Sequence, residues 1–289
     1  MVAFILFGAV LTGGALPPED IDGQSAIEIV TSFAHRVGYH GKLGLNSVGP
    51  VDGKRWGFGS GEYQAVGLAL PDKRWLNGYV SPSGRIQLFQ VSQPEVGQSR
   101  GTQRTTKPAI IQMAKKLIQA TGASGNFQMR AVQLGQTDPY AMVYFDIVVG
   151  GHKFLNLNPT YAYRLDFNAN TGEVSYFSRP PAIPEVVATK PSVSAAKAMA
   201  LLDRWGKTHY QSGRGSVYLY GPSWHYTPTL VPEIGYYKFA KEEKARLVWE
   251  AHIWTHFVKS EPLRESGELR VYVDAVTGQL IETDDQLMG

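Results

Sequence analysis

Three stretches of the chain carry apolar residues with the period of an amphipathic helix. They cover residues 25–38, 106–122 and about 194–206. Each stretch opens with a residue that can cap a helix, and these are Ser25, Thr106 and Ser194. In the first stretch Glu28 adds the spacing of a capping box. The pattern therefore predicts three helices, each with one buried face.

Each predicted helix is followed by sequence rich in Val, Tyr and Phe, which favours strands, and then by a turn. The second and third turns share one order: a polar residue, two further residues, Thr, Gly, any residue, and an aliphatic residue. In the first turn Ser81 stands at the polar position, with only Pro82 between it and Ser83. Asparagine or aspartate can accept hydrogen bonds from turn amides, and glycine adopts the left-handed conformation that other residues avoid. The expected turn residues are Ser83 and Gly84, then Asn168, Thr171 and Gly172, and finally Asp274, Thr277 and Gly278.

This repetition predicts an α+β fold of three tandem units, each an amphipathic helix packed on an antiparallel β-sheet. The units are expected at residues 20–95, 105–180 and 190–285. The polar sequence at 93–107 and the four prolines within 179–191 are typical of linkers between such units.

Residues 1–16 contain the apolar and small-residue parts of a secretory signal segment. The first basic residue is Arg36, so the positively charged part is missing, and a buried N-terminal strand is the alternative. If residues 1–15 are a signal, the protein is secreted or lies in the cell envelope. With the signal removed, no stretch reaches the roughly 18 apolar residues that span a membrane.

Composition excludes several kinds of chemistry. The 289 residues include no cysteine, which excludes thiol catalysis, disulfides and thiolate metal sites. The net charge is only +3, so nucleic acid is not an expected partner. None of the seven histidines precedes a glutamate, so the H-E-x-x-H zinc motif is absent from the sequence.

The third repeat carries a family resemblance. Residues 246–253 (RLVWEAHI) followed by 271–280 (VYVDAVTGQL) resemble the PepSY superfamily, and are similar to the C-terminal part of thermolysin-type protease propeptides. The tandem arrangement also resembles secreted proteins with the YcdB/YcdC-type repeated domain. The second copy fits less closely, and the first departs further because it lacks the aspartate and has Ser83 in place of threonine.

This resemblance implies a helix packed on a curled antiparallel sheet in each unit. It also implies binding or inhibition, often of peptidases, without catalysis, catalytic residues or a cofactor. The leading hypothesis is therefore a secreted, non-catalytic binding or regulatory protein whose partner is a peptidase or another envelope protein.

One local group of residues could bind a metal ion. Alternation along the expected strand at 249–257 places Glu250, His252 and His256 on one face. Neighbours two apart lie roughly 7 Å from each other, whereas the two histidines lie roughly 13 Å apart. Only Glu250 and His252 could share an ion, with a third ligand from another strand, which leaves a metal-dependent hydrolase as an alternative. The simpler interpretation is a solvent-facing polar surface.

Aromatic residues concentrate between 205 and 239. Prolines on both sides make Trp224, His225 and Tyr226 an expected surface loop and the preferred partner contact. Exposed aromatics would also suit a cell-wall or glycan-binding module, which is the second alternative. The glycine-rich segment 57–61 is expected to be a flexible loop, with a ligand-gripping loop as the other possibility.

Overall fold

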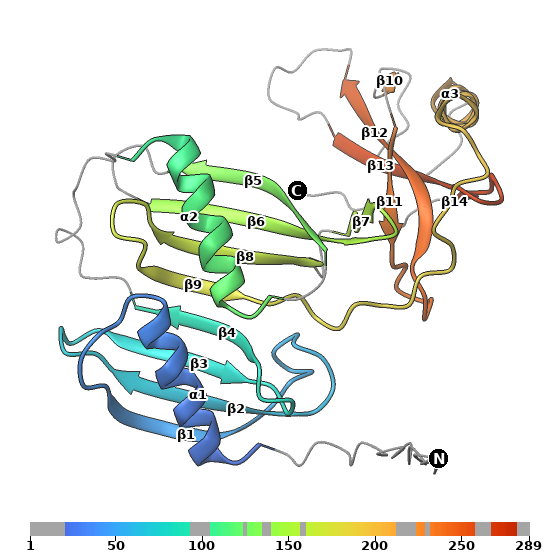
Figure 1. Cartoon of the computed structure of the whole chain (residues 1–289). Coiled ribbons are helices and arrows are strands. Elements are labelled where there is room, and N and C mark those ends of the chain that lie inside the picture. Colours follow the sequence, from blue (N-terminus) through green and yellow to red (C-terminus); the bar gives the residue numbers. More distant parts are fainter. Residues whose placement is uncertain are drawn as a thin grey trace, which may run out of the picture. The chain divides into compact units, whose positions relative to one another are not determined.

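The computed structural model describes residues 21–92, 105–123, 126–134, 140–156, 160–211, 224–228, 232–257 and 267–281. Side chains are not described for 131, 206–211, 224–228, 252–257 and 267–269. The expected signal segment at 1–16 lies outside the described residues. Figure 1 shows the arrangement of the elements.

The described residues form three helices and two sheets. The helices are α1 (Gly23–Arg36), α2 (Lys107–Ala120) and α3 (Ala195–Gln211). The larger sheet contains β1 (Gly44–Asp52), β2 (Glu62–Ala69), β3 (Trp75–Val80), β4 (Ile86–Val91), β5 (Phe127–Leu134), β6 (Tyr140–Val149), β7 (His152–Lys153), β8 (Ala162–Asn168) and β9 (Val174–Ser178). The smaller sheet contains β10 (Trp224–Pro228), β11 (Glu233–Tyr237), β12 (Arg246–Phe257), β13 (Gly267–Asp274) and β14 (Leu280–Ile281).

The larger sheet has the strand order β1-β2-β3-β4-β9-β8-β6-β5, with β7 paired to β6. The smaller sheet has the order β10-β12-β13-β14, with β11 also paired to β12. The chain is thus a mixed α/β protein with few helices and large antiparallel sheets. Contacts divide it into two compact units: unit 1 holds 1–123, 133–142 and 165–179, and unit 2 holds 124–132, 143–164 and 180–289. Three tandem units with the boundaries given above stay a prediction.

The first helix lies on one face of β1 to β4 (Figure 1). Its N-cap is Asp22, whose carboxylate accepts a hydrogen bond of 2.6 Å from the Ser25 amide. The predicted cap at Ser25 was therefore wrong, because Asp22 can also cap and begins the helix earlier. On the buried side, Phe33 packs edge-on against Phe89 of β4 with ring centres 4.9 Å apart.

The other two helices begin close to where the sequence predicts. Thr106 occupies the N-cap position of α2, but its side chain makes no capping hydrogen bond. Ser194 precedes α3, and its hydroxyl accepts a hydrogen bond of 3.3 Å from the Lys197 amide. This helix continues past the expected end at Gly206 to Gln211, since one glycine inside a helix costs only about 1 kcal/mol.

The glycines of the three expected turns adopt the same left-handed conformation, although the first turn is one residue shorter than the other two. Gly84, Gly172 and Gly278 have φ angles of 71°, 79° and 78°. A methyl group on these glycines would lie 3.7, 3.4 and 4.0 Å from Ile29, Met113 and Leu201, respectively. Each of those three side chains belongs to the seventh residue of its helix. Every helix therefore meets its turn at an equivalent position.

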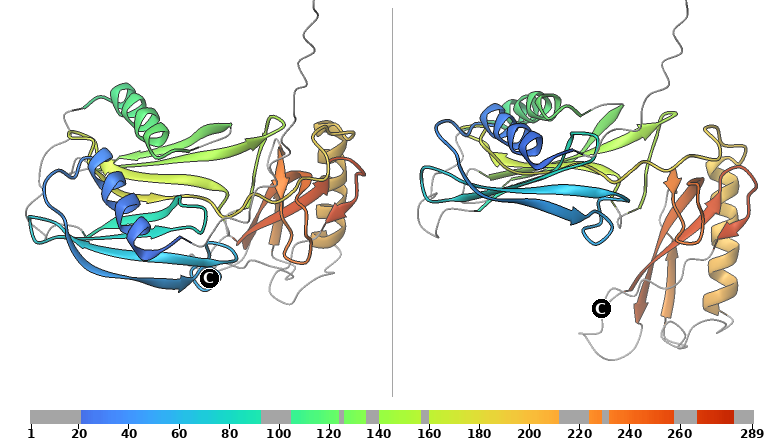
Figure 2. Two further views of the ribbon diagram at one scale, coloured as in Figure 1. Left: turned by 60° about the horizontal axis from the view of Figure 1, so that its bottom comes forward. Right: turned by 90° about the horizontal axis from the view of Figure 1, so that it is seen from below.

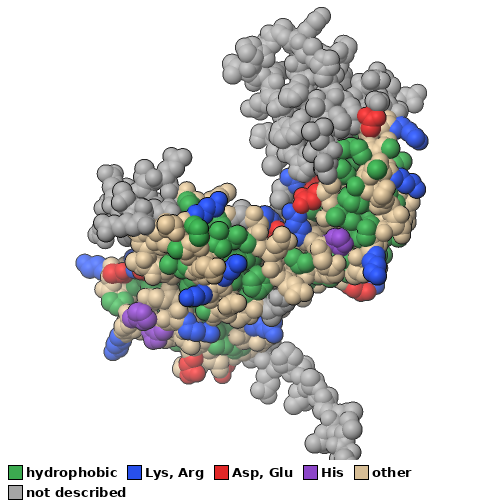
Figure 3. Space-filling model, turned by 45° about the horizontal axis from the view of Figure 1, so that its top comes forward, with side chains coloured by type: hydrophobic (Ala, Val, Ile, Leu, Met, Phe, Trp, Pro, Cys, Tyr) green, Lys and Arg blue, Asp and Glu red, His purple; other side chains and the backbone are tan. Residues whose placement is uncertain are grey.

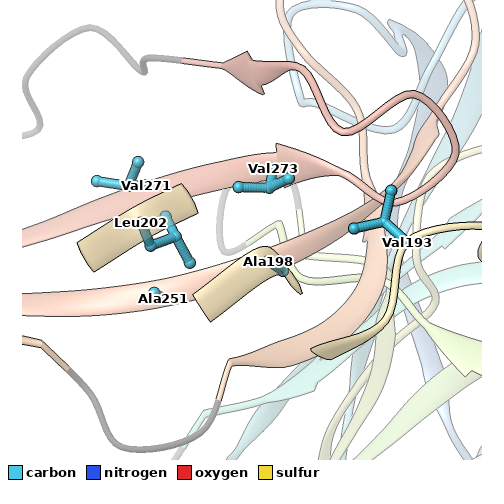
Figure 4. Packing of buried hydrophobic residues seen from close by; sticks show 6 residues of the cluster. All are labelled: Val193, Ala198, Leu202, Ala251, Val271 and Val273. Atoms are coloured by element: carbon cyan, nitrogen blue, oxygen red, sulfur yellow. The ribbon is translucent and has the colours of Figure 1, made fainter. Parts of the chain in front are cut away.

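The third helix lies against β10, β12 and β13 of the smaller sheet. Figure 4 shows the buried cluster between them, which consists of Val193, Ala198, Leu202, Ala251, Val271 and Val273. Trp249 packs against this cluster, and its indole N–H donates a hydrogen bond of 2.8 Å to the Val193 carbonyl. The apolar face expected for β12 thus lies against α3 at Trp249 and Ala251.

Candidate functional site

The candidate metal-binding residues Glu250, His252 and His256 lie on β12, the longest strand of the smaller sheet. β12 pairs with β13 on one side, so that Glu250 lies opposite Tyr272 and His252 lies opposite Arg270. On its other side, β12 pairs with β11 along its first half and with β10 along its second half. The side chain of His252 lies outside the described part of the chain.

Glu250 is buried, with only 3% of its surface exposed. The Tyr272 hydroxyl donates a hydrogen bond of 3.0 Å to its Oε1, and the Arg270 guanidinium lies 3.5 Å from the same oxygen. Burial raises the pKa of the Tyr272 hydroxyl, and the nearby charge of Glu250 raises it further. Tyr272 therefore stays a neutral donor, and the arrangement holds the carboxylate in place.

The expected solvent-facing surface at Glu250 was therefore wrong. Leu155 lies in one buried cluster with Val248 and Tyr272, on the side of β12 away from α3. Tyr237 and Phe239 close over the same cluster, and the rings of Tyr237 and Tyr272 have centres 4.4 Å apart. Alternation along one strand reveals its two faces but not a segment, distant in sequence, that covers the second face.

The metal interpretation gains no support from the side chains that the structure describes. Within them, no group of three or more His, Asp or Glu residues is placed to hold an ion. The strand register does add one neighbour that spacing along the sequence could not show, since His225 of β10 lies directly opposite His256 of β12. Those two side chains lie outside the described part of the chain.

Trp224, His225 and Tyr226 belong to β10 and not to the expected surface loop. The prolines misled that prediction, because a proline is tolerated at the end of an edge strand and Pro228 is the last residue of β10. Among the described strands, β10 pairs only with β12 and forms an edge of the smaller sheet. The preferred contact residues therefore lie on a sheet edge.

A hollow of about 500 Å³ lies beside the third turn in unit 2. Arg246 lines it and pairs with Glu242 at 2.7 Å and with Asp274 at 3.3 Å. Both ion-pair partners of Arg246 therefore also line the hollow. Elsewhere, Figure 3 shows Lys and Arg side chains scattered over the face in view, not gathered in one patch.

One motif was missed in the sequence. Residues 97–101 read Gly-Gln-Ser-Arg-Gly, the G-x-S-x-G spacing of a hydrolase nucleophile elbow, and lie outside the described residues. That elbow needs a strand leading directly into the serine and a helix directly after it. Among the described elements, β4 ends at Val91 and α2 begins at Lys107, so neither of these two adjoins Ser99.

Comparisons with known proteins show similarity in fold alone. No protein-family model matches the chain, and no curated protein matches it. An uncharacterized protein from Eubacterium rectale is 10% identical, with a TM-score of 0.52 over 90% of this chain and 81% of that one. The C-terminal domain of YpeB from Bacillus megaterium is 14% identical, with a TM-score of 0.49 over 94% of this chain and 100% of that one. The first of these likenesses is one of overall fold.

None of the helices that the structure describes is long and apolar enough to cross a membrane.

Proposed function

We propose that the protein is a secreted, non-catalytic binding and regulatory protein that contacts its partner through β10. The observation that carries this proposal is the position of β10 at an edge of the smaller sheet, paired on one side only among the described strands. An edge strand presents backbone donors and acceptors to which an extended segment of another protein can add. The edge thus offers a binding mode that needs no pocket.

The sequence of β10 suits this role. Trp224 and Tyr226 are two residues apart and share one face of the strand. Tryptophan and tyrosine are the residue types most often found at the energetic centres of protein interfaces. Backbone pairing along the edge would give affinity, and these two positions would give specificity.

The proposed partner is a peptidase, which the PepSY resemblance of the third repeat implies. Peptidases bind their substrates as extended chains, so an edge strand that pairs beside the cleft would occlude it. The buried contacts of Glu250 support a binding role over a chemical one, because its carboxylate holds Tyr272 and Arg270. The expected signal at residues 1–15 would bring the protein to such a partner outside the cell.

The test uses the full chain as bait in the secreted fraction of its own organism, with crosslinking, mass spectrometry and a casein hydrolysis assay. We expect capture of an identified peptidase and slower casein hydrolysis. The double variant Trp224→Ala/Tyr226→Ala should lose both effects. Trp75→Ala, which removes an exposed indole from unit 1, should keep them. Equal capture and inhibition by the β10 variant would overturn the proposal.

The hydrolase alternative has its own test, a zinc titration of the full chain. Binding heat together with a higher melting temperature would favour that alternative, and a flat titration would count against its metal-dependent form.

A further inference from the structure

The part of the larger sheet that lies in unit 1 has an unusual chemical character on the side that faces away from α1. Leu76, Gly78 and Val80 of β3 face α1, so the alternating residues Trp75, Asn77 and Tyr79 face the other way. Figure 2 shows α1 on one side of β1 to β4 and, among the described helices of unit 1, none on the other. We call this second side the open face. By the strand register it consists of Ser47, Gly49, Val51, Tyr63, Ala65, Gly67, Ala69, Trp75, Asn77, Tyr79, Leu88, Gln90, Tyr176 and Ser178.

Every strand position of the open face is uncharged, although 18% of the chain is Asp, Glu, Lys or Arg. Its centre is flat, because Gly67 lies between Ser47 and Asn77 and offers no side chain. A methyl group at Gly67 would lie 2.7 Å from the Ser47 hydroxyl and 3.5 Å from the Asn77 amide oxygen. The centre of the open face thus combines small residues with neutral hydrogen-bonding groups.

The loop between β1 and β2 places aromatic rings at one end of the open face. The glycine-rich β1–β2 loop closes with a hydrogen bond of 3.0 Å from the Gly53 amide to the Gly61 carbonyl. Phe58 is fixed by the Tyr63 hydroxyl, which donates to its carbonyl at 3.1 Å. Trp56 packs against Tyr79 with ring centres 5.2 Å apart, yet half of its surface remains exposed, at 50%. Several contacts thus place the aromatic side chains of this loop, and its expected flexibility stays a prediction.

A second exposed indole lies at the opposite end of the open face. Trp75 is 46% exposed and is four residues from Tyr79 on the same strand face. That separation is about 13 Å at roughly 3.3 Å per residue. Two exposed tryptophans thus lie at the two ends of the open face, whose flat, uncharged centre carries hydroxyl and amide groups.

We propose that the open face binds a neutral polysaccharide, with sugar rings stacked on Trp56 and Trp75 and hydroxyl groups bonded to Ser47, Asn77 and Gln90. The apolar C–H faces of pyranose rings stack on indoles, and their hydroxyls match neutral side chains that both donate and accept. The spacing of the two indoles calls for an oligosaccharide, because one sugar ring cannot reach both.

A polypeptide fits this surface less well. The centre of the open face offers small residues where an extended peptide needs pockets for its side chains, and it has no charge to complement charged groups. The adjacent sheet edge is also protected. β1 has an irregular register between Leu45 and Ser47, and Pro50 lacks an amide donor, which are two features that prevent strand addition.

The experiment measures binding of the full chain to chitohexaose and cellohexaose by calorimetry, and to insoluble chitin and cellulose by co-sedimentation. We expect binding to at least one of these neutral probes. Trp56→Ala and Trp75→Ala should each weaken it by at least about tenfold, as loss of an aromatic anchor does. Trp75→Phe should retain part of the affinity. Circular dichroism and melting temperatures check that the variants fold.

Two controls make the outcome specific. Leu45→Ala removes a residue that is 53% exposed and pairs with Leu68, on the helix side of the same sheet, so it should bind like the wild type. Trp224→Ala/Tyr226→Ala should also bind sugar normally, which separates this site from the β10 proposal. Absence of binding to all four probes would overturn the proposal, as would unchanged affinity in both tryptophan variants.

Discussion

At the scale of single residues, the second and third turns use different side chains to accept hydrogen bonds from their turn amides. The Asp274 carboxylate accepts hydrogen bonds from the amides of Val276 and Thr277 at 2.9 and 2.8 Å. The Asn168 amide oxygen does the same for Asn170 and Thr171 at 2.9 and 3.1 Å. The oxygen acceptor, and not the charge, is therefore the shared requirement of the turn.

The charge of Asp274 adds a dependence on pH. Burial alone would raise the pKa of its carboxyl, but hydrogen bonds from Thr277 and Val276, together with Arg246, outweigh burial. The net result is a pKa below the ordinary value of 3.8. A group whose pKa is lowered by folding stabilises the fold fully above its unfolded pKa, and this stabilisation is lost as the pH falls through the folded pKa.

We predict that Asp274→Ala lowers the free energy of unfolding by about 1–2 kcal/mol, because two partly buried amides lose their acceptor. Asp274→Asn should cost much less at pH 7, since asparagine already serves at position 168. The difference between wild type and Asp274→Asn should shrink as the pH is lowered from above 3.8. Urea unfolding at pH 7 and pH 3 measures both effects. Equal losses for the two variants at pH 7 would contradict the shared role.

At the scale of elements, the close approach of α1 to β3 depends on Gly78. A methyl group there would lie 2.5 Å from Cγ2 of Val30, a buried helix residue. The helix therefore rests directly on the strand backbone at this point. Gly49 of β1 is different, because a methyl group there would meet nothing within 4 Å.

Gly78→Ala should destabilise the protein by about 1–3 kcal/mol, because overpacking pushes α1 away from the sheet. Val30→Ala should recover part of this loss in the double variant, although it is destabilising by itself. Gly49→Ala is the matched control and should change stability by less than about 0.5 kcal/mol. Chemical unfolding of the four variants tests this packing, and a double variant with no recovery would refute it.

The elements also show what a sequence can and cannot predict. Helix periodicity and the turn residues are local, so the three helices and the placement of Gly172 and Gly278 could be inferred. The burial of Glu250 could not, because it depends on Leu155, which lies far away in the sequence. The open face was also missed, since Trp56, Trp75 and Tyr79 come together only through the register of three strands and a loop.

At the scale of the whole molecule, the two proposals assign different surfaces to different units. The open face belongs to unit 1, and β10 belongs to unit 2. One chain could thereby hold a polysaccharide with one unit and a protein with the other. Each surface has a variant that serves as the control for the other surface.

The same division predicts additive energetics. Gly78 lies in unit 1 and Asp274 lies in unit 2, and among the described residues they share no hydrogen-bond partner. The loss in the free energy of unfolding for Gly78→Ala/Asp274→Ala should equal the sum of the single losses within about 0.5 kcal/mol. Urea unfolding of the two single variants and the double variant checks this expectation. A larger coupling energy would show that the two sites are energetically coupled.

The three turns have one further consequence, which concerns how freely the sequence can change. Serine, asparagine and aspartate stand at the first position of the turn, at Ser81, Asn168 and Asp274, and each supplies an oxygen to amides of its own turn. A turn position that several residue types can occupy tolerates exchange among them at a small cost in stability. The sequence can then change while the fold is kept, which accords with a fold likeness over 90% of the chain at 10% identity.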